Sequence, residues 1–427
     1  MASEWKEQSL EDCMAAIIDY RGKTPRKTPS GIPLITAKVV KGGRIEKPDE
    51  FIAEDDYEPW MRRGIPEAND VVITTEAPLG EVAQLGRERV ALAQRLIALR
   101  GKRGILDNTF LKFLMQSSGV QDQLRARASG TTVFGIRQSE LRKVILRLPP
   151  FTEQLAIAHV LGTLDDKVEL NRSMSDTLEK IAQALFKSWF VDFDPIRAKA
   201  ERRDITLAPQ LADLFPTSFE NSQLGEIPTG WHVGQFGDVA VNPRRGVSPN
   251  EIQPTTPYIA LEHMPRKSIA LTDWGTAAGV ESGKFSFFAG EILFGKLRPY
   301  FHKVGVAPVD GVCSTDILVV GARSDNWFGF ILGHISSAAF VEHTNASSTG
   351  TKMPRTNWGD MARYPLVLPP EPIAKAFTER IRPFVSRILA SIHQSRTLTG
   401  LRDALLPKLI SGELRMPDAE RIVEKEL

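Results

Sequence analysis

A long internal repeat constrains the fold of this chain more than any other feature. The segment Ala128-Ser129-Gly130-Thr131 returns 220 positions later as Ser348-Thr349-Gly350-Thr351. Solenoid units recur about every 20–50 residues, so the repeated unit here is a whole domain and the helix that follows it. Three further pairs match at the same offset: Leu148-Pro149-Pro150 with Leu368-Pro369-Pro370, Thr177-Leu178 with Thr397-Leu398, and Ala184-Leu185 with Ala404-Leu405.

The length of the chain agrees with two domains. A single hydrophobic core usually stops growing at about 250–300 residues, and this chain has 427. Hydrophobic residues make up 42% of the sequence and charged residues 25%, which is typical of globular proteins and too apolar for a disordered one. Each half can therefore form a packed core.

Short apolar runs, separated by Gly, Pro, Asn and Asp, fill most of each half outside the helical pattern. Val71-Val72-Ile73 is such a run in the first half, and residues 258–261, 291–294 and 316–320 are the corresponding runs in the second. Runs of this length with this punctuation predict short strands. We therefore expect two mixed domains with the same fold and different surfaces.

A helical pattern begins after each Pro-Pro pair, with apolar residues at alternating spacings of three and four, as in a coiled-coil seam. An unbroken helix from Thr152 to Phe190 would be about 58 Å long at ~1.5 Å per residue, which suits a spacer. In the second copy Pro383, Gly400 and Pro407 predict kinks or fraying. The residues expected to pack the two helices are Ile157, Leu161, Leu164, Val168, Leu178, Leu185, Phe377, Ile381, Phe384, Ile388, Leu398 and Leu405.

Polar residues interrupt both helical stripes at the same height, at Asn171 and Ser175 in the first helix and at Ser391 in the second. Two interpretations stay open. If the helices pair, these residues fix the alignment of the pair at some cost in stability, as a buried Asn does in a coiled coil. Alternatively, each helix bends at this level and exposes the polar side chains to water.

These patterns divide the chain into six segments. Residues 192–225 contain several X-Pro pairs typical of a linker, and the residues after Gly412 are polar and expected to be loose. The expected segments are a first domain over 1–150, a spacer helix over 151–195, a linker over 196–225, a second domain over 226–369, a second spacer helix over 370–412 and a polar tail over 413–427.

Charge and cysteine content exclude several classes of protein. A net charge of +2 and a pI near 8.4 do not fit a protein that coats nucleic acid through bulk charge. Two cysteines, Cys13 and Cys313, cannot form a disulfide framework or a four-ligand zinc site. The sequence has no secretory leader pattern and no run of about eighteen apolar residues. We therefore expect a cytoplasmic protein that does not enter a membrane.

No catalytic motif is complete. Leu148 stands before Pro149-Pro150-Phe151, where an amino-methyltransferase needs a hydrogen-bond acceptor for its target amine. Residues 279–284 have three positions between the glycines of a phosphate loop instead of four, and Phe285 replaces its Ser or Thr. No Glu-x-Lys follows Pro48-Asp49 to complete a nuclease metal site, and the seven histidines lack metal-ligand spacing. We therefore expect no catalytic residue and no metal or cofactor bound by the chain itself.

Loops that combine Lys and Arg with Gln, Thr and Ser are candidates for DNA contact, because such side chains hold phosphates and recognise base edges. The two Ser/Thr-Gly-Thr loops are the strongest, since small residues with hydroxyls let the backbone approach a phosphate. The alternative is that these side chains are solvated and the loops are a repeated structural turn. The candidates are Lys38, Lys41, Arg44, Thr131, Thr132, Arg137, Gln138, Arg244, Arg245, Lys296, Arg298, Tyr300, Lys303, Thr351, Lys352 and Arg355.

The order of domains and helices resembles the specificity subunits of type I restriction-modification systems over nearly the whole chain. This resemblance implies an α+β fold. Two similar mixed α/β target recognition domains would stand in tandem, separated by two long helices that pair as an antiparallel coiled coil. The segments that carry the similarity are residues 20–25, 32–38 and 70–75, Glu153-Gln154, and residues 164–167 and 186–190.

The resemblance also implies a non-catalytic subunit that binds a bipartite site in double-stranded DNA. Its expected partners are modification (methyltransferase) subunits, two in number, and restriction (endonuclease and translocase) subunits. S-adenosylmethionine, ATP and Mg would be bound by those partners. The second helix begins Glu371-Pro372 and has lost the Glu-Gln pair, so we expect unequal contact of the two helices with the modification subunits. A non-catalytic adaptor with two related binding domains is the alternative.

Overall fold

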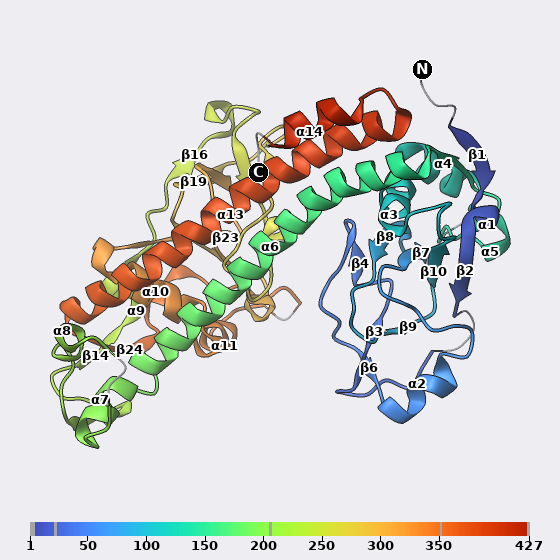
Figure 1. The fold of residues 1–427 in the computed structure, drawn as a ribbon. Helices are drawn as coiled ribbons and strands as arrows, with labels where there is room; N and C mark the ends of the chain where they lie inside the picture. The colour runs from blue at the N-terminus through green and yellow to red at the C-terminus, as the bar shows by residue number, and fades with distance from the viewer. Residues whose placement is uncertain (1–4, 21–23, 131, 205–206, 351, 425–427) are drawn as a thin grey trace. The chain divides into compact units, whose positions relative to one another are not determined.

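The computed structural model describes residues 5–20, 24–130, 132–204, 207–350 and 352–424, and the chain divides into two compact units. Unit 1 combines Met1–Lys167 with Leu398–Leu427, and unit 2 is Val168–Thr397. Two long helices belong to both units. Helix α6 (Phe151–Phe190) begins in unit 1 and ends in unit 2, whereas α13 (Glu371–Ser411) begins in unit 2 and ends in unit 1 (Figure 1). Both helices start within one residue of a predicted domain boundary.

Each unit is built on a four-stranded antiparallel sheet with the same strand order. The order is β2-β10-β7-β8 in unit 1 and β15-β23-β20-β21 in unit 2. All residues of β7 and β20 are buried, so these apolar strands form part of the core of their units. The strands are β2 (Met14–Asp19), β7 (Val71–Thr75), β8 (Leu79–Gln84), β10 (Leu96–Gly101), β15 (Ala240–Val241), β20 (Ile292–Gly295), β21 (Val304–Val306) and β23 (Ile317–Ala322).

The elements around this sheet also repeat. In each unit two helices follow the sheet, and a polar side chain caps one of them. Asp107 accepts a hydrogen bond from Phe110 N at 2.9 Å in unit 1, and Ser337 accepts one from Phe340 N at 3.2 Å in unit 2. The repeated pairs are β1 (Lys6–Ser9) and β14 (His232–Gln235), α1 (Leu10–Cys13) and α9 (Phe236–Val239), α3 (Asn108–Gln116) and α10 (Phe328–Ile335), α4 (Ser118–Ala126) and α11 (Ala338–Ala346), α5 (Gln138–Leu141) and α12 (Trp358–Ala362), and β11 (Ile145–Leu148) and β24 (Pro365–Leu368).

The units differ in their second sheet. In unit 1, β3 (Ile32–Ile35) lies between β6 (Phe51–Ile52) and β9 (Ala91–Leu92), whereas unit 2 has five strands in the order β16-β19-β22-β17-β18. Both sheets keep one parallel pair, β3 with β9 and β17 with β22. The other elements of this part are β4 (Val40–Lys41), β5 (Arg44–Ile45), α2 (Glu54–Trp60), β16 (Gly246–Val247), β17 (Pro257–Ile259), β18 (Gly275–Thr276), β19 (Lys284–Phe287) and β22 (Gly311–Cys313).

Within each unit the segments of α6 and α13 pack antiparallel, as predicted. In unit 2, Asn171 Nδ2 donates to Gln394 Oε1 at 2.9 Å, while the rings of Phe186 and Phe377 are 6.2 Å apart. From Asn171 to Phe186 along α6, the contacted residue in α13 moves back from Gln394 to Phe377, so the two helices run in opposite directions. Of the residues predicted to pack the helices, the partly buried ones are Val168, Leu178, Leu185 and Phe384, and the buried ones are Ile157, Leu161, Leu164, Phe377, Ile381, Ile388, Leu398 and Leu405.

The polar residues that interrupt the two helical stripes are buried in the interface between the helices. Asn171 and Ser391 are each 2% exposed, and Ser175 is 5% exposed and donates to the Asn171 carbonyl at 2.9 Å. The alternative of a water-exposed bend is therefore wrong. Pro383 and Gly400 do not interrupt α13, which is one helix from Glu371 to Ser411, because its buried apolar stripe outweighs weak local propensity.

The segments predicted as a linker and a tail hold structured elements. Ile196 and Phe215 are buried in the core of unit 2, and the Phe215 ring packs edge-on against Trp189 at 5.1 Å. Near the other end of the chain, Ala419 and Val423 are buried. Apolar side chains that find a core thus order both segments. Their elements are α7 (Asp194–Ala200), α8 (Pro209–Ala212), β12 (Phe219–Ser222), β13 (Gly225–Pro228) and α14 (Met416–Glu424).

In the described part of the chain, no helix has the length and apolar character needed to cross a membrane. The described His, Cys, Asp and Glu side chains form no group that could hold a metal ion.

Candidate nucleic-acid interface

A loop of small residues folds back on a hairpin in unit 1. The backbones of Ser129 and Gly135 exchange two hydrogen bonds of 2.8 and 3.0 Å, and Ile136 N donates to Thr75 O at the end of β7 at 2.9 Å. Gly130 has a φ of +127°, and a Cβ there would come within 2.1 Å of a backbone oxygen. Only glycine fits this turn. The loop is thereby fixed against the β7–β8 hairpin.

Unit 2 builds the same arrangement at the repeated positions. Thr349 and Arg355 exchange backbone hydrogen bonds of 3.0 and 2.9 Å, and Thr356 N donates to Lys296 O, after β20, at 3.1 Å. Ser129-Gly130 and Thr349-Gly350 thus belong to the same structural turn in the two units. This outcome does not exclude DNA contact, because the turn holds its tip at the surface.

The tips of both loops are exposed. Thr131 and Thr351, two predicted contacts, lie outside the described residues. Their neighbours Thr132 and Lys352 are exposed, and the Phe134 side chain is 62% exposed. The loop of unit 1 thus presents a hydroxyl and an aromatic ring, which can contact a nucleic acid, and the loop of unit 2 presents a cation, which can contact a phosphate.

The predicted cations of unit 1 are exposed and lie near carboxylates. Lys38 Nζ is 3.7 Å from Glu50, while Lys41 Nζ and Arg44 Nη2 are 3.7 and 3.9 Å from Glu46. Exposed pairs of this kind contribute about 0–1 kcal/mol, so a phosphate can replace the carboxylate at little cost. Arg137 and Gln138, also predicted contacts, stand at the start of α5, where Arg137 is exposed and Gln138 is half-buried.

Two predicted cations of unit 2 are held more firmly. Arg245 makes a two-pronged ion pair with Glu291, with N–O distances of 2.9 and 2.5 Å, and this carboxylate raises the pKa of the guanidinium. Arg355 Nε donates to Asp316 at 3.0 Å, and the pKa of Arg355 is raised by that hydrogen bond. Both arginines therefore have structural partners in the absence of DNA.

Other predicted residues of unit 2 lie along the β20–β21 hairpin. Tyr300 is 50% exposed, and the Arg298 guanidinium lies 5.9 Å from the centre of the Phe301 ring. Lys303 Nζ donates to the Leu261 carbonyl, and burial lowers the pKa of this lysine. The hairpin thus presents Tyr300 to solvent and uses Lys303 to tie its base to the second sheet.

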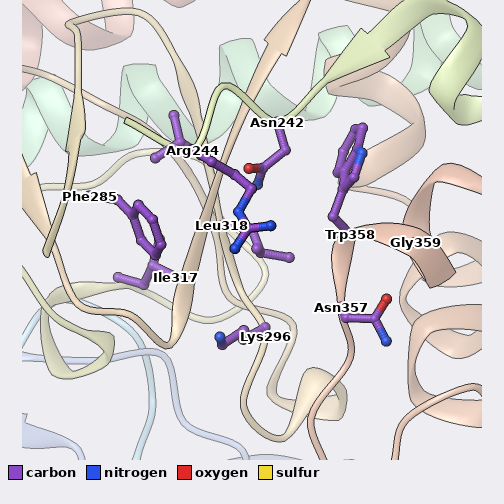
Figure 2. Close-up of a pocket in the computed structure, with 10 residues that line it drawn as sticks. Asn242, Arg244, Phe285, Lys296, Ile317, Leu318, Asn357, Trp358 and Gly359 are labelled. Atoms are coloured by element: carbon purple, nitrogen blue, oxygen red, sulfur yellow. The ribbon is translucent and has the colours of Figure 1, made fainter. Parts of the chain in front are cut away.

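Two further predicted residues, Arg244 and Lys296, line a cavity of about 330 Å³ in unit 2 (Figure 2). Among the described residues, neither side chain has a hydrogen-bond or ion-pair partner. The Arg244 guanidinium and the Asn242 amide point into the space between Phe285 and Trp358 (Figure 2). The structure therefore gathers two cations, two amides and two aromatic rings around one cavity.

The sequence analysis missed the other residues that line this cavity, among them the polar and aromatic side chains of Asn242, Phe285, Asn357 and Trp358. One signal was present. Asn357 and Trp358 stand 220 positions after Arg137 and Gln138, which were predicted contacts. No comparable signal marked Asn242 or Phe285, because the second sheet that places Phe285 is not repeated in unit 1.

The chain is similar in sequence to known proteins over most of its length. Residues 2–180 match the type I restriction modification DNA specificity domain. The chain is 25% identical over 398 residues to the MjaIX specificity subunit of Methanocaldococcus jannaschii, covering 91% of this chain and 88% of that one. It is 25% identical over 319 residues to the EcoDI specificity subunit of Escherichia coli, covering 73% and 71%.

The fold is also similar to that of a solved protein. The crystal structure of the type I restriction-modification system S subunit from M. genitalium aligns with a TM-score of 0.53 at 14% identity, and the alignment covers 95% of this chain and 96% of that one. At this identity the likeness concerns the fold alone.

Proposed function

The chain belongs to the specificity subunits of type I restriction-modification systems, with two recognition domains, and from this premise we propose how its residues recognise DNA. Each unit places a Ser/Thr-Gly-Thr loop and the adjoining hairpin against double-stranded DNA and reads one half of a bipartite site. The observation that carries this proposal is the shared backbone arrangement, in which Ile136 N donates to Thr75 O in unit 1 and Thr356 N to Lys296 O in unit 2.

Phosphate contacts position such a protein, and base contacts give it specificity. The exposed cations Lys38, Lys41 and Lys352 are suited to phosphates, because they are held only by long pairs or by none that the described residues provide. Arg137 and Gln138 in unit 1 stand where they can address base edges, as arginine does guanine and glutamine does adenine. Binding should therefore weaken steeply as salt concentration rises.

The catalytic steps belong to other subunits in this proposal. The chain would dock modification subunits, two in number, and restriction subunits, and direct them to the DNA site. S-adenosylmethionine would be bound by the modification subunits, and ATP and Mg by the restriction subunits. The buried interface of α6 and α13 supports a role for these helices as a fixed spacer rather than as a catalytic element.

The test is methylation mapping by single-molecule sequencing of DNA exposed to S-adenosylmethionine and the co-expressed modification subunit, with and without this chain. We expect a split motif that appears only when the chain is present. A folded complex that leaves no motif would contradict the proposal and favour a protein-interaction adaptor.

A pair of variants assigns the half-sites. Arg137→Ala should change or relax one half of the motif and leave the other intact, because it lies in unit 1. Lys352→Ala, an exposed cation of unit 2, should lower methylation at all sites without changing the motif, since a phosphate contact carries no sequence information. Loss of both half-sites with Arg137→Ala would show that the units do not read separately.

A further inference from the structure

The cavity in unit 2 has the size and lining of a site for one planar base. Phe285 of β19 and Trp358 of α12 stand on either side of it, and Ile317 and Leu318 of β23 contribute apolar surface (Figure 2). Enzymes that take a base out of the duplex hold it between aromatic or apolar side chains and bind its edge by hydrogen bonds. A cavity of about 330 Å³ has room for such a ring.

Two polar side chains of the cavity, Asn242 and Arg244, lack partners in the described part of the chain, whereas Asn357 is hydrogen-bonded to Asp360. Asn242 Oδ1 is buried and accepts no hydrogen bond. A buried acceptor without a donor is unfavourable, so a ligand that supplies an N–H removes this penalty. Arg244 is exposed, with its backbone at a φ of +46°, and its guanidinium has no acceptor among the described residues. The cavity thus offers an acceptor and a donor close together, both without partners.

A purine base supplies the complementary groups. Guanine carries N–H groups beside the O6 acceptor, and adenine carries an amino group beside a ring nitrogen. Lys296, the other cation of the cavity, is placed to hold the phosphate of the same nucleotide. We propose that this cavity takes one purine turned out of the DNA stack, with Asn242 and Arg244 binding its edge between Phe285 and Trp358. This inference rests on the proposed function.

In unit 1 a buried aromatic ring occupies the position that corresponds in sequence to Arg244. Arg244-Arg245-Gly246 matches Tyr20-Arg21-Gly22, so Tyr20 stands where Arg244 does. The Tyr20 side chain is 3% exposed, its hydroxyl donates to the Gly64 carbonyl, and its ring stacks on Trp60 with centroids 6.0 Å apart. Unit 1 therefore fills this position with a ring of its own. We expect only unit 2 to take up a base.

The test uses mispaired duplexes and the full chain without the modification subunit, so that base-pair opening by a partner does not contribute. Once the motif is mapped, each base pair of the half-site read by unit 2 is mispaired by changing one strand at a time. A protein that extrudes a base gains affinity when its base pair is already broken, because the cost of opening is removed. We expect one purine position at which mispairing the opposite base tightens binding about ten-fold or more.

Variants identify the residues. Arg244→Ala and Asn242→Ala should each abolish the gain at that position. The matched control is Lys352→Ala, an exposed cation of unit 2 outside the cavity, which should weaken binding to paired and mispaired duplexes equally and keep their ratio.

Three results would contradict the proposed base-binding site, the residues assigned to it or the proposed function. If no mispaired position binds more tightly while the wild-type chain still prefers its motif, the cavity does not take up a base. If the gain persists in both cavity variants, another part of unit 2 opens the duplex. If the wild-type chain fails to distinguish its motif from a shuffled duplex, the proposed function itself fails.

Discussion

Unit 1 and unit 2 share the sheet that carries their loops and differ in the sheet beside it. The four-stranded sheets have the same strand order, and the same turn packs beside each of them, where Ser129 pairs with Gly135 and Thr349 with Arg355. The second sheet has three strands in unit 1 and five in unit 2. The four-stranded sheet, which both units share, fixes the backbone of the loop that we propose approaches DNA. The second sheet, which differs between the units, supplies side chains such as Phe285. The comparison indicates that this fold separates the position of the interface from its chemistry.

The units also differ in how they hold a carboxylate of α6. In unit 1, Asp165 lies between Lys112 and Arg402 and pairs with both. In unit 2, Glu179 accepts hydrogen bonds from the Ser268 hydroxyl and the Ile269 amide, each at 2.9 Å. No ion pair with Glu179 is found in the described residues, and burial raises its pKa. The first carboxylate is balanced by charge and the second by hydrogen bonds alone.

The largest effect is expected from breaking the charged arrangement of unit 1. Asp165→Asn leaves Lys112 and Arg402, which are 10% and 17% exposed, without their shared carboxylate. Breaking a largely buried pair in this way should lower the free energy of unfolding by about 2–4 kcal/mol, measured by urea denaturation. Asp122→Asn removes an exposed pair with Arg125 of the same unit and should cost at most about 0.5 kcal/mol. Equal losses would contradict the difference in burial.

A somewhat smaller loss is expected from crowding the helix contact of unit 2. Gly333 stands where unit 1 has Phe113, and a Cβ at Gly333 would lie 2.0 Å from the Phe186 ring. Gly333→Ala should therefore destabilise the protein by about 1–3 kcal/mol through overpacking. Gly119→Ala, in α4 of unit 1, meets no atom within 4 Å and should be neutral or stabilising. Thermal unfolding of the two variants side by side gives the sign of each.

The two carboxylates should also differ in their pH dependence. The Glu179 pKa is raised above its ordinary value of 4.5, so its contribution to stability is complete below that pH and is lost as pH rises through the folded pKa. Glu179→Gln removes this loss. The stability of the variant relative to wild type should therefore increase from pH 4.5 upward, as followed by urea midpoints at several pH values. A constant difference would show that Glu179 titrates normally.

The smallest change in stability is expected from a substitution that makes α13 more like α6. Gly400 of α13 corresponds to Lys180 of α6, and nothing lies within 4 Å of a Cβ at Gly400. Gly400→Lys should stabilise the chain by about 0.5–1 kcal/mol, because glycine is the poorer helix former. The same replacement of Gly333 should destabilise it instead, which provides the comparison in a single denaturation series.

The sequence predicted what depends on repetition and periodicity. The two domains and the two long helices follow from the 220-residue offset and from spacings of three and four, whereas their antiparallel pairing was implied by the family resemblance. It did not predict that residues 416–424 form a helix, because the burial of Ala419 and Val423 appears only in the folded chain and no long apolar stripe marks this segment. Nor did it predict the strands of the second sheet that unit 2 alone possesses.

The interface was predicted only in outline. Whether a cation is available depends on the carboxylate beside it, and Arg245 pairs with Glu291, 46 positions away along the chain. Arg244, its immediate neighbour, has no such partner in the part of the chain that the structure describes. Nothing in a sequence distinguishes two adjacent arginines in this way, because the backbone of the loop between β15 and β16 decides which one turns toward the acid.

The two long helices bring the last part of the chain back to the unit in which the chain begins. The chain passes from unit 1 to unit 2 along α6 and returns along α13, and Trp5 lies 3.5 Å from the Cβ position of Gly412 within unit 1. A short peptide joining these neighbours would remove α14 but leave the sheets of each unit and both long helices in place, and the chain could then be opened elsewhere, for example near Gly225. The order of the two domains along the gene is therefore not fixed by the fold, and a permuted chain should assemble into the same molecule.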